Sequence, residues 1–354
     1  MKTKRMLLAL AISVCCACAI PQATSTPPVK LTKAMKDEAV SGLVKALNDN
    51  YVFPDVAKKM ETSFRDRQRK GEYDAITEGP AFAKLLTEHA QAVSKDKHLR
   101  VQFHNNKVQM PGMGGGPTPQ AMVDRDKEMK RINGGFERVE RLQGNVGYID
   151  FRFFGEHPIA FKAVDSAFGF VQNTDALIID IRQNGGGSPE MVAYICSYLF
   201  DEKPVHLNSL YFRPTNETEE FWTKAELPGP RYLDKPVYVL TSNYTFSGAE
   251  EFSYNLRNLK RATIVGETTG GGAHPGGMEK LSDYFTAFIP SGRAINPITK
   301  TNWEGTGVEP HIKVAAAEAL KTAHADAIGK LLAAAKTPSD KTWLTEVLER
   351  VKKG

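Results

Sequence analysis

The sequence has little cysteine, no strong excess of charge of either sign and only one long apolar run. Four of the 354 residues are cysteine, and three of these lie near the start of the chain. Cys196 therefore stands alone in the rest of the chain, which excludes a disulfide framework, and no residues have the spacing of a zinc site. The formal net charge of +5 comes without a dense basic run, so nucleic acid is not an expected partner.

The single long apolar run opens the chain. Lys2, Lys4 and Arg5 precede the apolar residues 6–20, and small residues suited to a signal peptidase close the run. A run this short, followed by polar sequence with proline, is typical of a secretory signal peptide and not of a membrane span. We expect residues 1–23 to be a signal peptide and the protein to be exported to the periplasm or the extracellular space. A lipid anchor on one of the leader cysteines stays an alternative.

The composition after this leader is that of an ordinary globular protein, with 41% hydrophobic and 25% charged residues over the whole chain. Apolar residues recur at helical spacing in residues 31–103, as at Val40, Leu43 and Leu47, and predict an N-terminal helical bundle. Residues 104–137 contain a stretch rich in Met, Gly and Pro and are predicted to be a linker.

Short β-branched and aromatic runs alternate with helical segments from residue 138 to residue 314, which predicts a mixed α/β core with strands buried on both faces. The expected strands cover residues 146–151, 176–181, 237–241, 262–265 and 284–289, and the expected helices cover 189–200 and 248–259. Residues 315–354 are rich in Ala, Leu and Lys and predict a helical tail that is broken at Pro338.

Two turns of small residues follow buried strands. After Asp180, the glycines at 185–187 allow the backbone to approach a ligand closely, and their N–H groups can hold an oxyanion or a phosphate. The turn lacks the spacing of nucleotide-binding loops, and a tight turn without function is the alternative. In the second turn, Ser247 and Gly248 open a helix, so Ser247 is placed either as a nucleophile or as an ordinary N-cap.

Seven short runs, each weak when taken singly, together resemble one family. They are Asn50-Tyr-Val-Phe-Pro, Asp96-Lys-His-Leu-Arg, Asn145-Val-Gly-Tyr-Ile, Asp180-Ile-Arg-Gln-Asn-Gly-Gly-Gly, Thr245-Phe-Ser-Gly-Ala-Glu-Glu-Phe, Val265-Gly-Glu-Thr-Thr-Gly-Gly-Gly-Ala-His-Pro-Gly and Gly305-Thr-Gly-Val-Glu-Pro-His-Ile. In this order the chain resembles the serine peptidase family of the tail-specific (C-terminal processing) proteases, the tricorn core protease and the interphotoreceptor retinoid-binding protein modules. It is most similar to the retinoid-binding-protein-like branch, which the run Thr268-Thr-Gly-Gly-Gly-Ala-His-Pro-Gly-Gly resembles. Residues 104–143 are too few for the PDZ domain of the tail-specific members. The resemblance implies an α/β fold with a crotonase/ClpP-like core.

The resemblance also implies roles for single residues. Ser247 would be the nucleophile, His98 the general base and then the general acid, and Glu304 a carboxylate in the polar relay that orients the base. The oxyanion hole would be formed by the backbone N–H groups of Gly248 and Gly186. Tail-specific members use a lysine where this chain has glycines, so a Ser-Lys dyad is not expected unless another lysine substitutes.

Alternatives remain for several of these residues. His274 is a rival base or, with Arg182 and Asn184, a candidate for the substrate groove, although Arg182 and Asn184 can also brace the glycine turn. His98 has the ordinary alternative of a surface histidine, and Lys97 beside it would lower its pKa. Two nearby carboxylates, Glu267 and Glu309, compete with Glu304.

These observations predict a secreted or periplasmic serine peptidase that cleaves peptide bonds through an acyl-enzyme at Ser247. The expected substrate is a peptide or protein, and the site needs neither a metal nor an organic cofactor. A non-catalytic module that binds apolar ligands, or an esterase or thioesterase on the same site, is the alternative. The oligomeric state stays open.

Overall fold

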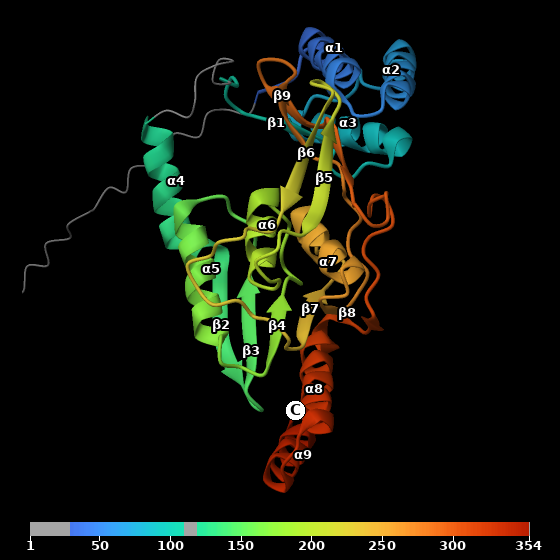
Figure 1. Ribbon diagram of the computed structural model, residues 1–354. Coiled ribbons are helices and arrows are strands. Elements are labelled where there is room, and N and C mark those ends of the chain that lie inside the picture. The colour runs from blue at the N-terminus through green and yellow to red at the C-terminus, as the bar shows by residue number, and fades with distance from the viewer. Residues whose placement is uncertain (1–28, 110–118, 354) are drawn as a thin grey trace, which may run out of the picture.

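The computed structural model describes residues 29–109 and 119–353, so the predicted signal peptide and its cysteines lie outside the described residues. N-terminal helices stand at one end of the molecule, a sheet flanked by helices forms the middle, and two C-terminal helices form the other end (Figure 1). In the described part of the chain, no helix has the length and apolar character needed to cross a membrane.

Three N-terminal helices form where helical periodicity predicted them. They are α1 (Lys33–Asn50), α2 (Pro54–Arg69) and α3 (Gly79–Ser94). The Thr32 side chain caps α1 by accepting from the Met35 N–H, and Pro54 starts α2, where its missing N–H costs no helical hydrogen bond.

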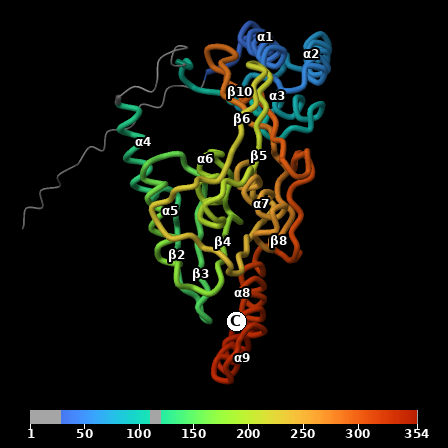
Figure 2. Tube along the Cα trace, viewed as in Figure 1, coloured from blue at the N-terminus to red at the C-terminus, as the bar shows by residue number. Residues whose placement is uncertain are grey.

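These helices do not close a core alone. They pack on a small antiparallel sheet in the order β1-β10-β9, formed by β1 (Arg100–Phe103), β10 (Phe285–Pro290) and β9 (Gly276–Lys280). Phe285 of β10 meets the ring of Phe82 in α3 at 5.7 Å. The expected division between a bundle at 31–103 and a core at 138–314 is therefore too simple, because two strands from the second segment cover the apolar face of the bundle. The trace in Figure 2 shows this return of the chain to the N-terminal helices.

The predicted linker is also partly structured. Helix α4 (Pro119–Arg131), a single 3-10 turn (Asn133–Gly135) and the start of strand β2 all lie within residues 104–137, and residues 110–118 lie outside the described residues. Glycine and proline gather in the first half of this segment, whereas the second half has the polar, charged composition of an exposed helix. The linker prediction is therefore wrong for the second half.

The central sheet has six strands in the order β12-β8-β7-β4-β3-β2. They are β2 (Phe136–Leu142), β3 (Val146–Phe151), β4 (Ala176–Asp180), β7 (Val237–Thr241), β8 (Thr263–Gly266) and β12 (Ile312–Lys313). Only β2 runs antiparallel to its neighbour, and β3, β4 and β7 are buried along their whole length, which confirms the predicted strands and their double-sided burial.

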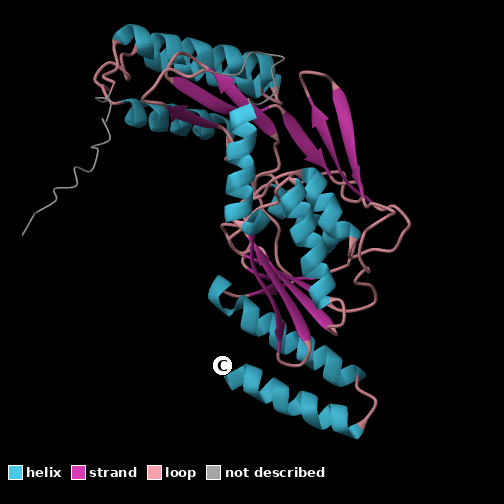
Figure 3. Ribbon diagram, turned by 90° about the vertical axis from the view of Figure 1, so that its left-hand side faces the viewer, coloured by secondary structure: helices cyan, strands magenta, loops and turns pink. Residues whose placement is uncertain are grey.

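Helices cover both faces of this sheet (Figure 3). One face packs against α5 (Pro158–Val171), α6 (Pro189–Ser197) and α7 (Gly248–Asn258), and the other against α8 (Ala316–Ala334) and α9 (Pro338–Lys353). Pro338 begins α9, as the predicted break in the tail requires. A third sheet, β11-β5-β6, was not expected and is built from β5 (His206–Phe212), β6 (Glu217–Trp222) and β11 (Gly292–Ile295).

Candidate active site

The two predicted turns lie side by side because they follow β4 and β7, which are parallel neighbours in the sheet. The Phe246 N–H donates to the Asn184 carbonyl at 3.2 Å, and the Ser242 hydroxyl donates to the Arg182 carbonyl at 2.5 Å. Residues about 60 positions apart are thereby held as one unit at the carboxyl edge of the sheet.

Ser247 has an unusual backbone for a residue at a helix start. Its φ of 54° and ψ of −123° differ from the extended conformation of an ordinary N-cap, and such a conformation costs a non-glycine residue about 1–3 kcal/mol. The Glu250 carboxylate accepts the Ser247 N–H at 2.9 Å and also accepts the N–H groups of Gly271 and Gly272. Burial raises the pKa of Glu250, while these hydrogen bonds oppose the rise. Glu250 therefore holds the strained turn and ties it to the 270–272 loop.

The glycine turn approaches Ser247 without room for side chains. A Cβ on Gly186 would lie 2.8 Å from the Ser247 Cβ and 2.7 Å from the Gly248 nitrogen. The Gly186 N–H, however, donates to the Asn184 Oδ1 at 2.9 Å, so the prediction of Gly186 as a free oxyanion donor is wrong. Among the described residues, the N–H groups of Gly187 and Gly248 form no hydrogen bond, and a Cβ on Gly248 would lie 3.0 Å from the Gly187 nitrogen.

His98 lies in the loop between α3 and β1 and packs against the second turn. Its ring centroid is 4.6 Å from that of Phe246, and a Cβ on Gly272 would lie 2.6 Å from its Cε1. Both ring nitrogens are buried without a hydrogen-bond partner in the described chain. Burial lowers the pKa of His98 to about 4, with Asp96 opposing and His274 and Arg100 adding to the lowering. The pKa of His98 is lowered, as was expected beside Lys97, but the causes are burial, His274 and Arg100, and Lys97 is not among them.

Ser247 and His98 line one pocket of about 530 Å³. The remaining lining residues are glycines, apolar side chains, two cations and a glutamine, and come from several elements: Gly185, Gly187, Gly276, Phe246, Phe288, Met278, Pro189, Pro275, Lys97, Arg100 and Gln102. Within the described residues no hydrogen bond joins the Ser247 and His98 side chains. Catalytic contacts of this kind are often long until a substrate is bound, so the shared pocket is the relevant observation.

A buried polar cluster lies behind His98. The His274 Nδ1 is 2.7 Å from the Asp96 Oδ2 and 3.5 Å from the Glu304 Oε2, and the Ala273 N–H donates to Glu304 at 2.6 Å. Burial and the Asp96 charge raise the pKa of Glu304 to about 7. Glu304 thus contacts the rival base His274, whereas Asp96 lies between the two histidines. The sequence predicted no role for Asp96, although it stands two residues before His98 in the run Asp96-Lys-His-Leu-Arg.

This cluster also has the spacing of a cation site. Ligand atoms of Asp96, His274 and Glu304 all lie within 4.8 Å of one another, the one such group in the part of the chain that the structure describes. The Asp96 Oδ2 and the His274 Nδ1 are engaged with each other, so a cation would first have to displace that hydrogen bond.

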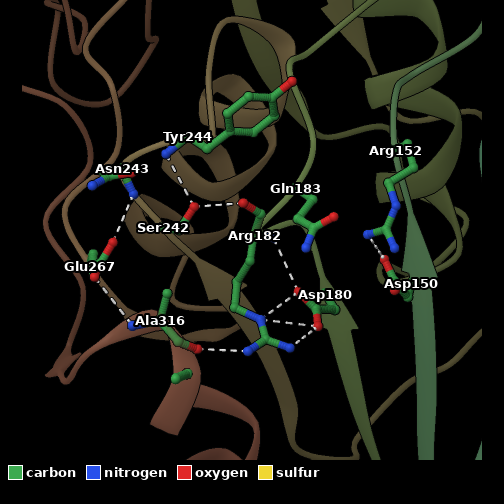
Figure 4. A pocket seen from close by; sticks show the side chains of 11 residues that line it. Asp150, Arg152, Asp180, Arg182, Gln183, Ser242, Asn243, Tyr244, Glu267 and Ala316 are labelled. Atoms are coloured by element: carbon green, nitrogen blue, oxygen red, sulfur yellow. Dashed lines mark hydrogen bonds and ion pairs between the residues drawn. The ribbon is translucent and has the colours of Figure 1, made fainter.

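The three groove candidates do not line the Ser247 pocket. His274 is buried behind Asp96, and Asn184 is buried with its amide donating to the Phe151 carbonyl, in the bracing role that was the alternative. Arg182 lies in a separate pocket of about 900 Å³, where Figure 4 shows it between Asp180 and the Ala316 carbonyl. These three residues were groove candidates because they stand next to glycine turns, but adjacency to such a turn does not determine the direction in which a side chain points. The rival carboxylate Glu267 also lines that second pocket.

The fold and the paired turns define an α/β protein with a site at the carboxyl edge of a parallel sheet. Residues 145–314 match the profile of peptidase family S41, and residues 27–132 match the N-terminal domain of peptidase S41 in eukaryotic IRBP. The chain belongs to peptidase family S41.

Individual relatives match over shorter stretches. The chain is 29% identical over 136 residues to the tricorn protease of Thermoplasma volcanium, and this stretch covers 38% of this chain and 12% of that protein. It is 30% identical over 141 residues to the carboxyl-terminal-processing protease of Synechocystis sp., covering 39% of this chain and 31% of that protein. The chain thus spans less than a third of the length of either relative. The solved structure of mature CPAF is similar in fold, with a TM-score of 0.56, 14% identity, and coverage of 90% of this chain and 97% of the other.

Proposed function

We propose that this protein is an exported serine peptidase that cleaves peptide bonds through an acyl-enzyme at Ser247. The observation that carries the proposal is the strained Ser247 at the start of α7, in one pocket with the neutral, buried His98. Membership of family S41 supports it, and the leader sequence supports export. An ordinary N-cap needs neither the positive φ nor a histidine in the same pocket.

The chemistry follows from these positions. The Ser247 Oγ attacks the carbonyl carbon of the scissile bond while its proton passes to the His98 Nε2. The N–H groups of Gly248 and Gly187 donate to the oxyanion, with Gly187 in place of Gly186 because the Gly186 N–H is engaged. The C–N bond then breaks, His98 returns its proton to the leaving amine, and water releases the acyl group by the same steps. Glu304 contributes to the relay behind the base through His274.

Labelling with a fluorophosphonate tests the nucleophile. We expect the wild-type protein to gain one adduct, located by mass spectrometry on Ser247, and Ser247→Ala to gain none. We also expect His98→Ala to lose labelling and His274→Ala to keep most of it, since only His98 lines the pocket. Labelling that depends on His274 and not on His98 would transfer the role of base to His274.

The same experiment separates the alternatives. The apolar lining of Phe246, Phe288 and Met278 also suits a module that binds apolar ligands. If the folded wild-type protein is not labelled at Ser247, both hydrolase functions are excluded and binding of apolar ligands remains. If Ser247 is labelled, peptide and ester panels of matched structure then divide a peptidase from an esterase or thioesterase.

A further inference from the structure

We propose that Asp96 is the carboxylate that orients His98 for proton transfer, and that His274 and Glu304 influence the orientation of the base through Asp96. The proposal rests on the proposed function, since it assigns a positioning residue to the same reaction. It differs from the relay expected from the sequence, in which Glu304 was the carboxylate of the site.

The first Asp96 oxygen holds His98. Oδ1 accepts the main-chain N–H of His98 at 3.0 Å and lies 4.0 Å from the His98 Nδ1. The Asp96 side chain is 1% exposed, so water does not screen this pair. Because the His98 Nδ1 is buried without a partner, its proton is best satisfied by a small approach of the ring toward Oδ1.

This contact determines which nitrogen can act as the base. A proton held on Nδ1 by Asp96 leaves Nε2 unprotonated and able to take the Ser247 proton. Without the carboxylate, the neutral imidazole can carry its proton on either nitrogen, and the tautomer with Nε2–H cannot accept a proton from serine. Asp96 therefore selects the productive tautomer as well as the ring orientation.

The second Asp96 oxygen faces the rest of the cluster. Oδ2 is 2.7 Å from the His274 Nδ1 and 3.3 Å from the Tyr51 hydroxyl, which donates to it. Glu304 pairs with this network at His274, 3.5 Å away, and among the described residues it forms no hydrogen bond with His98. The ionisable groups that face Asp96 are thus Tyr51, His98 and His274, with Glu304 and Arg100 beyond them.

Asp96→Asn tests the proposal, because the amide keeps a similar shape and loses the charge. We expect the second-order rate of fluorophosphonate labelling at Ser247 to fall by about 10²- to 10⁴-fold, with KM for a peptide substrate changed less than about threefold. The residual rate should rise about tenfold per pH unit, because hydroxide must then remove the serine proton. Glu304→Gln should lose less than about tenfold. Asp55→Asn, which removes an exposed carboxylate at the start of α2, is the matched control and should stay within about threefold.

A tautomer measurement keeps the proposal testable if Asp96→Asn does not fold. In the wild-type protein with ¹⁵N-labelled histidine, we expect His98 to carry its proton on Nδ1, with its signals assigned by their loss in His98→Gln. A proton on Nε2, or labelling of folded Asp96→Asn at the wild-type rate, would overturn the role of Asp96. If the role of Asp96 is overturned but the wild-type protein is still labelled at Ser247, the proposed function stands. If the wild-type protein is not labelled at all, the proposed function itself is overturned.

Discussion

Glu251 is a buried acid that the proposed reaction does not use. It follows Glu250 in α7, its Oε1 has no hydrogen-bond partner in the described residues, and burial raises its pKa to about 8, which Asn208 and Asn255 partly oppose. A carboxyl group with a pKa near 8 is protonated at neutral pH, which removes the large cost of an unpaired buried charge.

This residue predicts that stability depends on pH. The folded pKa of about 8 lies above the ordinary 4.5, so the folded protein binds more protons than the unfolded chain between these values. The free energy of unfolding should therefore be highest near pH 5 and should fall as pH rises toward 8, by a few kcal/mol, on the order expected from such a shift. Urea unfolding at pH 5 and pH 8 measures this fall.

Glu304 also has a raised pKa and contributes to the same pH dependence of stability. The contribution of Glu251 is therefore measured by comparing the wild-type protein with a variant that lacks this carboxyl group. Glu251→Gln should unfold with a smaller loss between pH 5 and pH 8 than the wild-type protein. The exposed Glu226→Gln should behave as the wild type. An unchanged pH dependence in Glu251→Gln would contradict this reading of the buried acid.

At the scale of elements, the glycine turn between β4 and α6 is held from both sides. Gly187 has a φ of 140°, and a Cβ there would lie 2.2 Å from the Phe154 carbonyl oxygen. The Phe154 carbonyl accepts the Ser188 N–H at 2.8 Å, and the Phe154 N–H donates to the Gly186 carbonyl at 2.8 Å. The segment after β3 therefore supports the turn that faces Ser247.

Gly187→Ala should disturb both stability and chemistry. The added methyl group must push the turn away from Phe154, which we expect to cost about 2–4 kcal/mol and to lower the labelling rate at Ser247 by about 100-fold or more. Chemical unfolding and labelling kinetics measure the two effects. Gly185→Ala is the control for stability, because no atom lies within 4 Å of its Cβ position, and it should change the unfolding free energy by less than about 1 kcal/mol. Equal losses in both variants would contradict the argument.

Element prediction succeeded where one local pattern dominated. The buried strands of the central sheet and the helices α1–α3 and α7 have clear periods of two or of about 3.6 residues. Strands β6 and β9 were missed because they are mostly exposed and carry little apolar signal. Their pairing depends on partners that lie far away in the sequence, which a local pattern does not contain.

At the scale of the whole molecule, the site joins two parts of the fold. His98 comes from the loop after the N-terminal helices and Ser247 from the turn between β7 and α7, so their distance depends on how these two parts of the fold pack. Arg213, at the end of β5, donates to the main-chain carbonyls of Tyr51 and Asn48 at 2.8 and 2.9 Å. It thereby ties the third sheet to the end of α1, next to the Tyr51 side chain that contacts Asp96.

Removal of this connection should loosen the site. We expect Arg213→Met to destabilise the protein by about 1–3 kcal/mol, to speed hydrogen exchange at the end of α1, and to lower the Ser247 labelling rate by up to about tenfold. Arg293→Met is the matched control: Arg293 is exposed and lies over the Tyr211 ring, and it should change these quantities little. Exchange that speeds equally throughout the protein would show a global effect and contradict a role at this contact.

Local sequence was sufficient to predict the buried central strands, most helices, and the two turns that place Ser247 and the glycines at one edge of the sheet. These features were predictable because a short apolar period, or a group of small residues after a strand, is contained within a few neighbouring residues. The tertiary structure alone decided that Asp96, not Glu304, faces His98, that the Gly187 N–H is free while that of Gly186 is engaged, and that strands β1, β9 and β10 line the pocket. These features depend on side-chain directions and on contacts between distant segments, such as the pair Asp96 and His274, which are 178 residues apart.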